Sequence, residues 1–248
     1  MRYGAVHDKV KLAKSRERLR DLYSQMPSTK GCLENNSKPE SEGGCGSWCC
    51  REQSPSVWYV EFLNAWNNIA QNWTNQQVLD LVEKSLRNYL FPNKTRGCVF
   101  WDKESKLCGH HNVRPYNCRV YGVEPEQEFN DRLVRLKVIY PNAKNQCDLV
   151  STESGAPVTE KQTKRWWASL KGAELFIGVP LNLLHDNMDG SYRHYHDHVL
   201  LHLFDDHLME QLTSIRVEGD PMQKEMCIRS VLNGLVDFSN KYDSEQQK

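Results

Sequence analysis

The spacing of apolar residues along this chain predicts a mainly helical protein. In several ranges they recur every three or four positions, the repeat of one face of a helix; these ranges are 5–26, 57–71, 127–140 and 191–216. Further helix starts are marked by capping residues. Thr74 and Thr159 each stand three positions before a glutamine, in the capping-box arrangement, and Asp220 stands directly before a proline.

Two segments depart from the helical pattern. Residues 27–44 are rich in Pro, Ser, Gly and Asn, which predicts a loop or linker. Residues 98–109 predict a short β-hairpin, with a first strand at 99–101, a turn at 102–105 and a return at Leu107. The expected fold is therefore mainly α with a small β-hairpin, in which a cysteine-rich segment packs against a helical C-terminal half.

The pattern divides the chain into three parts. Residues 1–26 form a basic amphipathic helix, 27–150 a cysteine-rich region, and 151–248 a helical region that could be continuous with the region before it. The basic face of the first helix could dock on an acidic partner, but such charge runs are usually solvated faces, and we favour that interpretation.

Composition excludes several classes of protein. The 32 basic and 32 acidic residues balance, so no net charge favours a nucleic-acid partner. Mean hydropathy is −0.70, and no apolar run approaches the length of a membrane span. The first residues lack the apolar core of a secretory signal, which predicts a cytoplasmic protein. Nucleotide-binding glycine motifs and the Gly-x-Ser-x-Gly hydrolase motif are absent.

Cysteine supplies the strongest chemical signal in the chain. Eight of the nine cysteines fall between residues 32 and 147. In a reducing compartment such a set favours metal ligation by thiolates over a disulfide framework, which remains the alternative. The candidate metal ligands are Cys45, Cys49, Cys50, Cys98, Cys108, Cys118, Cys147 and Cys32.

The cysteine spacing does not fit a zinc ribbon, which would show two Cys-x-x-Cys pairs. Adjacent side chains usually point in different directions, so Cys49 and Cys50 need not bind the same ion. The spacing fits a cluster wrapped by several loops, or two neighbouring metal sites. Arg114 and Arg119 flank Cys118, and their charge would lower thiol pKa values and offset the negative charge of a metal–thiolate centre.

These motifs together resemble the YkgJ-type cysteine-cluster family. The resemblance rests on Cys45-x3-Cys49-Cys50, on Cys98-Val-Phe, and on Cys108 followed by Arg114-Pro-Tyr-Asn-Cys118-Arg119. It covers about residues 32–150 and implies a zinc- or iron-chelating domain, often described as an Fe–S oxidoreductase. Flagellin lysine N-methylase is similar over the same region, so the family is not confined to one activity. Cys32 lies farther from Cys45 than the family's first cysteine usually does from its second.

A second candidate site lies in the C-terminal half. On a helix, His194, His198 and His202 would stack at intervals of four, close to Asp205 and Asp206. Two such histidines can bind a metal ion, but histidines satisfied by neighbouring acids are the preferred interpretation. A packed thiol and buried aromatic rings are likewise the simpler interpretations of further conspicuous side chains, namely Cys227, Trp66, Trp166 and Trp167.

Three functions remain open at this point. The leading hypothesis is a metalloprotein that holds an iron–sulfur cluster, or zinc, and has a redox or protein-modifying role with a protein partner or protein substrate. The second is a non-enzymatic module that zinc stabilises and that binds another protein. The third is a metalloenzyme whose site lies on the helix of residues 194–207.

Overall fold

The computed structural model describes residues 9–28, 30–35, 37–92, 97–121, 123–139, 158–178 and 192–246, and it confirms a mainly helical fold with a small antiparallel sheet. The elements, in chain order, are α1 (Lys9–Ser24), α2 (Lys30–Asn35), the 3-10 turn η1 (Glu40–Glu42), α3 (Trp48–Glu52), β1 (Ser56–Val57), α4 (Tyr59–Asn72), α5 (Asn75–Leu90), the 3-10 turn η2 (His111–Val113), α6 (Tyr116–Val120), α7 (Glu126–Ile139), α8 (Glu160–Ile177), β2 (Arg193–His194), α9 (Tyr195–Leu203), α10 (Asp206–Glu218) and α11 (Pro221–Gln246).

The predicted helix starts are confirmed by their capping hydrogen bonds. The Thr74 side chain accepts from the Gln77 amide, and the Gln77 side chain accepts from the Thr74 amide at 2.8 Å, which opens α5. Thr159 begins α8 by the same reciprocal bonds. Asp220 accepts from the amide of Gln223 at 2.8 Å and begins α11. These local bonds satisfy amide groups that a helix start otherwise leaves without partners.

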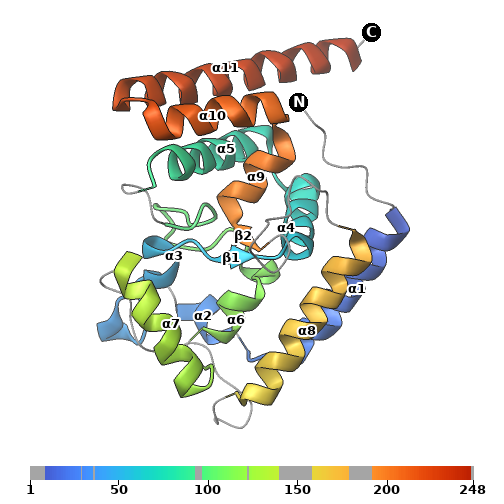
Figure 1. Ribbon diagram of the computed structural model, residues 1–248, viewed down its shortest axis with the longest axis vertical. Coiled ribbons are helices and arrows are strands. Elements are labelled where there is room, and N and C mark those ends of the chain that lie inside the picture. The colour runs from blue at the N-terminus through green and yellow to red at the C-terminus, as the bar shows by residue number, and fades with distance from the viewer. Residues whose placement is uncertain are drawn as a thin grey trace.

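The helices form two buried apolar clusters. In the larger one, α5 packs against α9, α10 and α11, which Figure 1 shows stacked at one end of the molecule. In the smaller one, α1 and α8 lie side by side and close over α4 and α6, with Leu19, Trp58 and Leu170 in the centre. Residues from both halves of the sequence therefore contribute to each cluster.

The two-stranded sheet joins segments that are far apart in the sequence. β1 pairs with β2 in antiparallel fashion, with Ser56 opposite His194 and Val57 opposite Arg193. The hairpin predicted at 98–109 is reduced to one antiparallel bridge between Trp101 and Cys108. The chain does turn back there, but the paired stretch is too short for two regular strands.

The prediction of one continuous helix over 191–216 is wrong. The structure divides this range into β2, α9 and α10. Phe204 is extended, with φ −106° and ψ 147°, and the Asp205 side chain accepts from the amide of Leu208 at 2.9 Å. Asp205 thus caps a new helix, and the chain changes direction where the apolar spacing had suggested one continuous element.

The loop predicted over 27–44 also contains regular structure, because α2 and η1 lie within it. Its glycines are needed for close packing of the backbone. A Cβ atom on Gly44 would lie 2.2 Å from the carbonyl oxygen of Lys38; Gly46, just beyond this segment, is needed for a different reason, its left-handed backbone with φ +57°. The segment therefore folds back on itself before the cysteines of α3. Within the described part of the chain, no helix combines the length and the apolar character needed to cross a membrane.

Candidate metal centre

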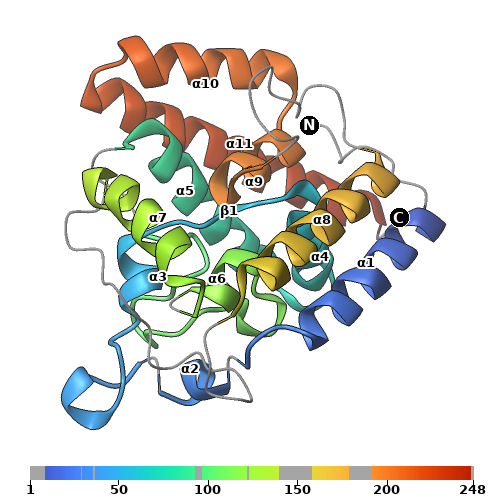
Figure 2. The ribbon, with the colours of Figure 1, turned by 60° about the horizontal axis from the view of Figure 1, so that its bottom comes forward.

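The cysteine-bearing elements lie on one side of the β1–β2 sheet. Cys32 is on α2, Cys49 and Cys50 are on α3, and Cys118 is on α6; these helices are neighbours in both ribbon views (Figures 1 and 2). The remaining described cysteines of this region come from loops, and they are Cys45, Cys98 and Cys108. Cys147 lies outside the described residues. No disulfide joins two of the described cysteines.

Backbone contacts bring the separate cysteine segments together. The Cys98 amide donates to the Cys50 carbonyl at 2.7 Å, and Gly97 permits this approach because a Cβ there would lie 2.7 Å from the Arg51 carbonyl oxygen. The Ser47 hydroxyl donates to the Lys106 carbonyl in the turn that leads to Cys108. The loop of residues 98–109 is thus held against α3.

The thiols are close enough to share protons. The Sγ atoms of Cys49 and Cys50 lie 4.0 Å apart. A hydrogen bond from the Cys50 thiol lowers the pKa of Cys49 to about 6, and the alternative hydrogen bond of the same thiol proton lowers the pKa of Cys108. The pKa of Cys50 itself rises well above its usual range. Thiolates that lie beside a shared thiol are donors suited to a soft metal ion.

The thiols of Cys98 and Cys118 are held neutral by their surroundings. Burial raises the pKa of Cys118 to about 12, and burial together with the charges of Cys108 and Cys118 raises the pKa of Cys98. Both thiols would lose their protons only when a metal ion binds, because the ion stabilises the thiolate. Within the described residues, no group of three or more His, Cys, Asp or Glu side chains is already arranged to hold an ion. The thiols gather in one region without converging on a point.

Arg114 lies at the centre of this region and is 4% exposed. One guanidinium nitrogen donates to the Cys118 carbonyl at 2.8 Å, and another donates to Nε2 of His111 at 2.9 Å. Burial alone would lower the pKa of Arg114, but negative charge on Cys118, Cys32, Cys49 and Cys50 raises it. The buried cation is therefore placed to offset the charge that these thiols, Cys32 on α2 among them, would acquire on losing their protons to a bound metal ion.

Arg119 has a different environment from Arg114. Its Nε donates to the Arg114 carbonyl at 2.8 Å, and its guanidinium lies 4.3 Å from the centre of the Tyr23 ring. Burial lowers the pKa of Arg119. Arg119 stabilises the backbone of the Arg114–Cys118 turn through this hydrogen bond, and its positive charge acts on Cys118. It lies farther from the other thiols than Arg114 does.

Glu61 on α4 positions the start of α6, a role that sequence reasoning missed. Its carboxylate accepts from the Tyr116 amide at 2.7 Å, the Tyr23 hydroxyl at 2.6 Å and the Trp58 amide at 3.1 Å. Tyr116 is the first residue of α6, two positions before Cys118. Glu61 is the one acidic residue in the apolar sequence from 57 to 63, which is the signal that could have identified it.

Several buried polar side-chain atoms lack hydrogen-bond partners, and Trp101 Nε1 in the loop of residues 98–109 is one of those next to the cysteine segments. Both ring nitrogens of His110 are buried without a partner, and so is the hydroxyl of Tyr195. The His110 ring packs on Trp73 and Phe100, and burial lowers its pKa to about 4, which keeps it neutral. Buried polar atoms without partners are rare in folded proteins. The thiols, the buried cation and these free polar atoms fit a region that receives a bound metal centre.

The candidate histidines of the C-terminal half contact backbone carbonyls and aromatic rings, where a polar helix face or pairing with neighbouring acids was the preferred expectation. His198 is buried, and its Nε2 lies 3.1 Å from the Val57 carbonyl oxygen. The ring of His202 contacts the rings of Phe62 and Trp66, with centroids 5.3 and 4.8 Å away. His194 precedes α9 and approaches the Ser54 carbonyl at 3.0 Å. These contacts tie α9 to α4 and β1.

A second buried carboxylate, Glu174 on α8, makes the stability of the fold depend on pH. It accepts from the Val60 amide at 2.8 Å and the Tyr59 amide at 3.3 Å, at the start of α4. Burial raises its pKa to about 7. Between its unfolded value near ~4.3 and about 7, the folded protein binds a proton that the unfolded chain has released, so stability falls as pH rises.

We expect the Glu174→Gln variant to lack this decline, because glutamine stays neutral. From pH 4.5 to 8, the free energy of unfolding of the wild type relative to the variant should fall by up to about 3 kcal/mol. Urea unfolding at several pH values measures the difference, and the opposing titration of buried His196 and His198 cancels in it. A constant difference across this range would contradict the prediction.

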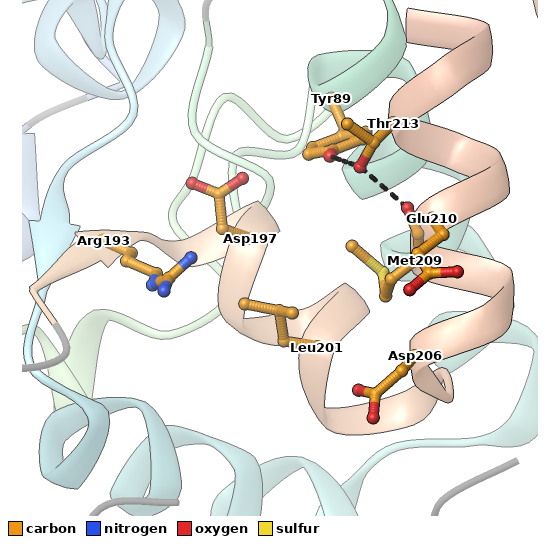
Figure 3. A pocket seen from close by; sticks show the side chains of 8 residues that line it. All are labelled: Tyr89, Arg193, Asp197, Leu201, Asp206, Met209, Glu210 and Thr213. Atoms are coloured by element: carbon orange, nitrogen blue, oxygen red, sulfur yellow. Dashed lines mark hydrogen bonds between the residues drawn. The ribbon is translucent and has the colours of Figure 1, made fainter. Parts of the chain in front are cut away.

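A separate pocket of about 490 Å³ lies between α5, α9 and α10 (Figure 3). It is lined by Tyr89, Arg193, Asp197, Leu201, Asp206, Met209, Glu210 and Thr213. Three carboxylates face one guanidinium, so the pocket favours a cationic group over an anion. Its lining contains no cysteine, which separates it from the candidate metal centre.

Comparison with known proteins gives one match. A family model described as CxxCxxCC, a putative zinc- or iron-chelating domain, matches residues 41–153. The match contains Cys45, Cys118 and the thiols between them, whereas Cys32 precedes it. No curated protein and no solved structure matches the chain.

Proposed function

We propose that this protein holds a metal centre through thiolates of its first half, and the match of residues 41–153 to a family model of zinc- or iron-chelating domains supports this. One observation supports the proposal: thiols from α2, α3, α6 and two loops gather around the buried cation Arg114. The proposed ligands come from the set Cys32, Cys45, Cys49, Cys50, Cys98, Cys108, Cys118 and Cys147, and Arg114 and Arg119 balance their charge.

We favour an iron–sulfur cluster over a single zinc ion. A structural zinc site uses four donors, and this region offers more thiols than four. Bound iron would supply electron-transfer chemistry, whereas zinc has no redox chemistry and would stabilise the fold. The role that we propose is redox or protein-modifying, in a cytoplasmic protein that acts with a protein partner or substrate. The acidic pocket beside α10 supports a partner that presents a positively charged group.

A non-enzymatic, zinc-stabilised binding module is the second candidate. It is favoured by the separation of the thiols into several loops, which a structural metal would draw together. In that case the helices of the C-terminal half would bind the partner.

Metal analysis of oxygen-free protein tests both candidates. For the iron–sulfur proposal we expect a coloured preparation with iron and sulfide in equal numbers and a broad visible absorption that bleaches on reduction. Chelation of the metal should lower the melting temperature, because the thiols would lose the ion that holds their loops together.

The zinc module predicts a colourless protein with stoichiometric zinc and no response to reductant. A folded protein that takes up neither metal, also after reconstitution with iron and sulfide or with zinc alone, would contradict both candidates. Serine variants of Cys227 provide the control, since this thiol lies on α11, outside residues 41–153 and outside the proposed ligand set.

A further inference from the structure

Tyr195 connects the C-terminal half to the cysteine region. It is the first residue of α9 and directly follows β2, whose pairing with β1 fixes its position close to α3. Its ring is 1% exposed and stands edge-on to Phe100, with centroids 4.6 Å apart. Phe100 lies in the loop that begins with Cys98 and returns through Cys108. The residue thus reaches this loop from outside the matched domain.

The hydroxyl of Tyr195 is buried and has no hydrogen-bond partner among the described residues. Other tyrosines of the core do have one. The hydroxyl of Tyr23 donates to Glu61 at 2.6 Å, and that of Tyr89 lies 2.8 Å from the hydroxyl of Thr213. Burial of a hydroxyl without a partner costs free energy, and phenylalanine would avoid the cost. The position therefore indicates that a partner joins this site.

The surroundings of this hydroxyl identify the chemistry of the missing partner. Burial raises the pKa of Tyr195 well above its usual range, and negative charge on Glu61, Cys118, Cys98 and Cys108 adds to the effect. The group therefore stays protonated and is available as a donor. Its ring packs on Phe100, which stands between Cys98 and Cys108 in one loop, so thiols are the metal-binding groups of the segment that Tyr195 contacts. Thiolates accept hydrogen bonds.

We propose that the Tyr195 hydroxyl donates a hydrogen bond to a sulfur atom of the bound metal centre. This inference rests on the proposed metal-binding function and extends it to a residue outside the family domain. Tyr195 acts as a positioning residue, since its bond goes to a ligand sulfur and not to a reacting group. Such bonds stabilise negative charge on sulfur, tighten metal binding and raise the reduction potential of an iron–sulfur centre.

The Tyr195→Phe variant tests the proposal on the full chain, because phenylalanine keeps the ring that packs on Phe100. If the wild-type protein holds zinc, we expect about tenfold weaker zinc affinity in competition with a chelator. If it holds an iron–sulfur cluster, we expect the same iron and sulfide content and a lower reduction potential. The metal-free variant should melt at the same temperature as the metal-free wild type or higher, since it no longer buries a free hydroxyl.

Tyr89→Phe is the matched control, because the Tyr89 hydroxyl already has a partner, Thr213 on α10, and not a cysteine. It should lower the melting temperature equally with and without metal and leave metal affinity and potential unchanged. If Tyr195→Phe keeps the wild-type metal affinity and reduction potential, the inference is wrong although the protein still binds metal. A metal-free variant that is less stable than the metal-free wild type would also contradict the inference. A wild-type protein that binds no metal would overturn the proposed function and this inference with it.

Discussion

Replacing Arg114 with methionine is expected to abolish stable metal binding. The guanidinium is the buried positive charge closest to several thiolates, and methionine fills a similar volume without charge or donors. Loss of one member of a buried charge set costs about 3 to 5 kcal/mol, because the remaining charges are left uncompensated. Metal content after gel filtration and urea unfolding of the metal-loaded protein measure the two effects.

Arg114→Lys separates charge from geometry in the same experiment. Lysine keeps the positive charge but cannot match the paired bonds to His111 and to the Cys118 carbonyl. We expect intermediate metal affinity and intermediate stability. An Arg114→Met protein that keeps full metal content would show that the guanidinium does not balance the thiolates, and the assignment of its role would be wrong.

Removing the Glu61 carboxylate should have the second large effect. In Glu61→Ala, the amides of Trp58 and Tyr116 and the hydroxyl of Tyr23 lose their acceptor in a buried region. Each buried donor without a partner costs about 1 to 3 kcal/mol, so the total is expected to reach about 3 kcal/mol or more. Because Tyr116 opens α6, metal content should fall as well, through misplacement of Cys118.

Glu61→Gln is the control for this prediction. Its amide oxygen can still accept, and its shape is retained, so we expect a smaller loss of stability and nearly full metal content. Denaturant unfolding of the two variants and metal analysis of each provide the comparison. Equal stability of Glu61→Ala and wild type would contradict the role assigned to these hydrogen bonds.

Local patterns in the sequence were sufficient to predict most helices. Thr74 and Thr159 mark helix starts through bonds to a residue three positions away, so no distant contact is needed to identify them. The break at Phe204 and Asp205 was not predicted, because the apolar spacing continues across it and the cap depends on one side chain. Periodicity reports which face is buried, and it is insensitive to a change of direction between two helices.

Long-range contacts explain what the sequence did not reveal about the candidate site. The cysteines were identified as a set from their number, and the family match agrees with that interpretation. The roles of Glu61 and Tyr195 depend on segments that meet only in the folded chain. β1 and β2 have two residues each, too short to leave an alternation that could be recognised. The placement of Cys32 near Arg114 likewise depends on the turn through Gly44 and Gly46.

The pairing of β1 with β2 bears on the order of assembly. Ser56 and His194 are 138 positions apart, so this pairing closes a long loop and forms late in folding. During synthesis the chain leaves the ribosome from its N-terminus, and every cysteine of the first half emerges before β2 does. We therefore expect the thiols to be accessible to an incoming metal ion until α9 docks, and Tyr195 to cover the site once α9 is in place.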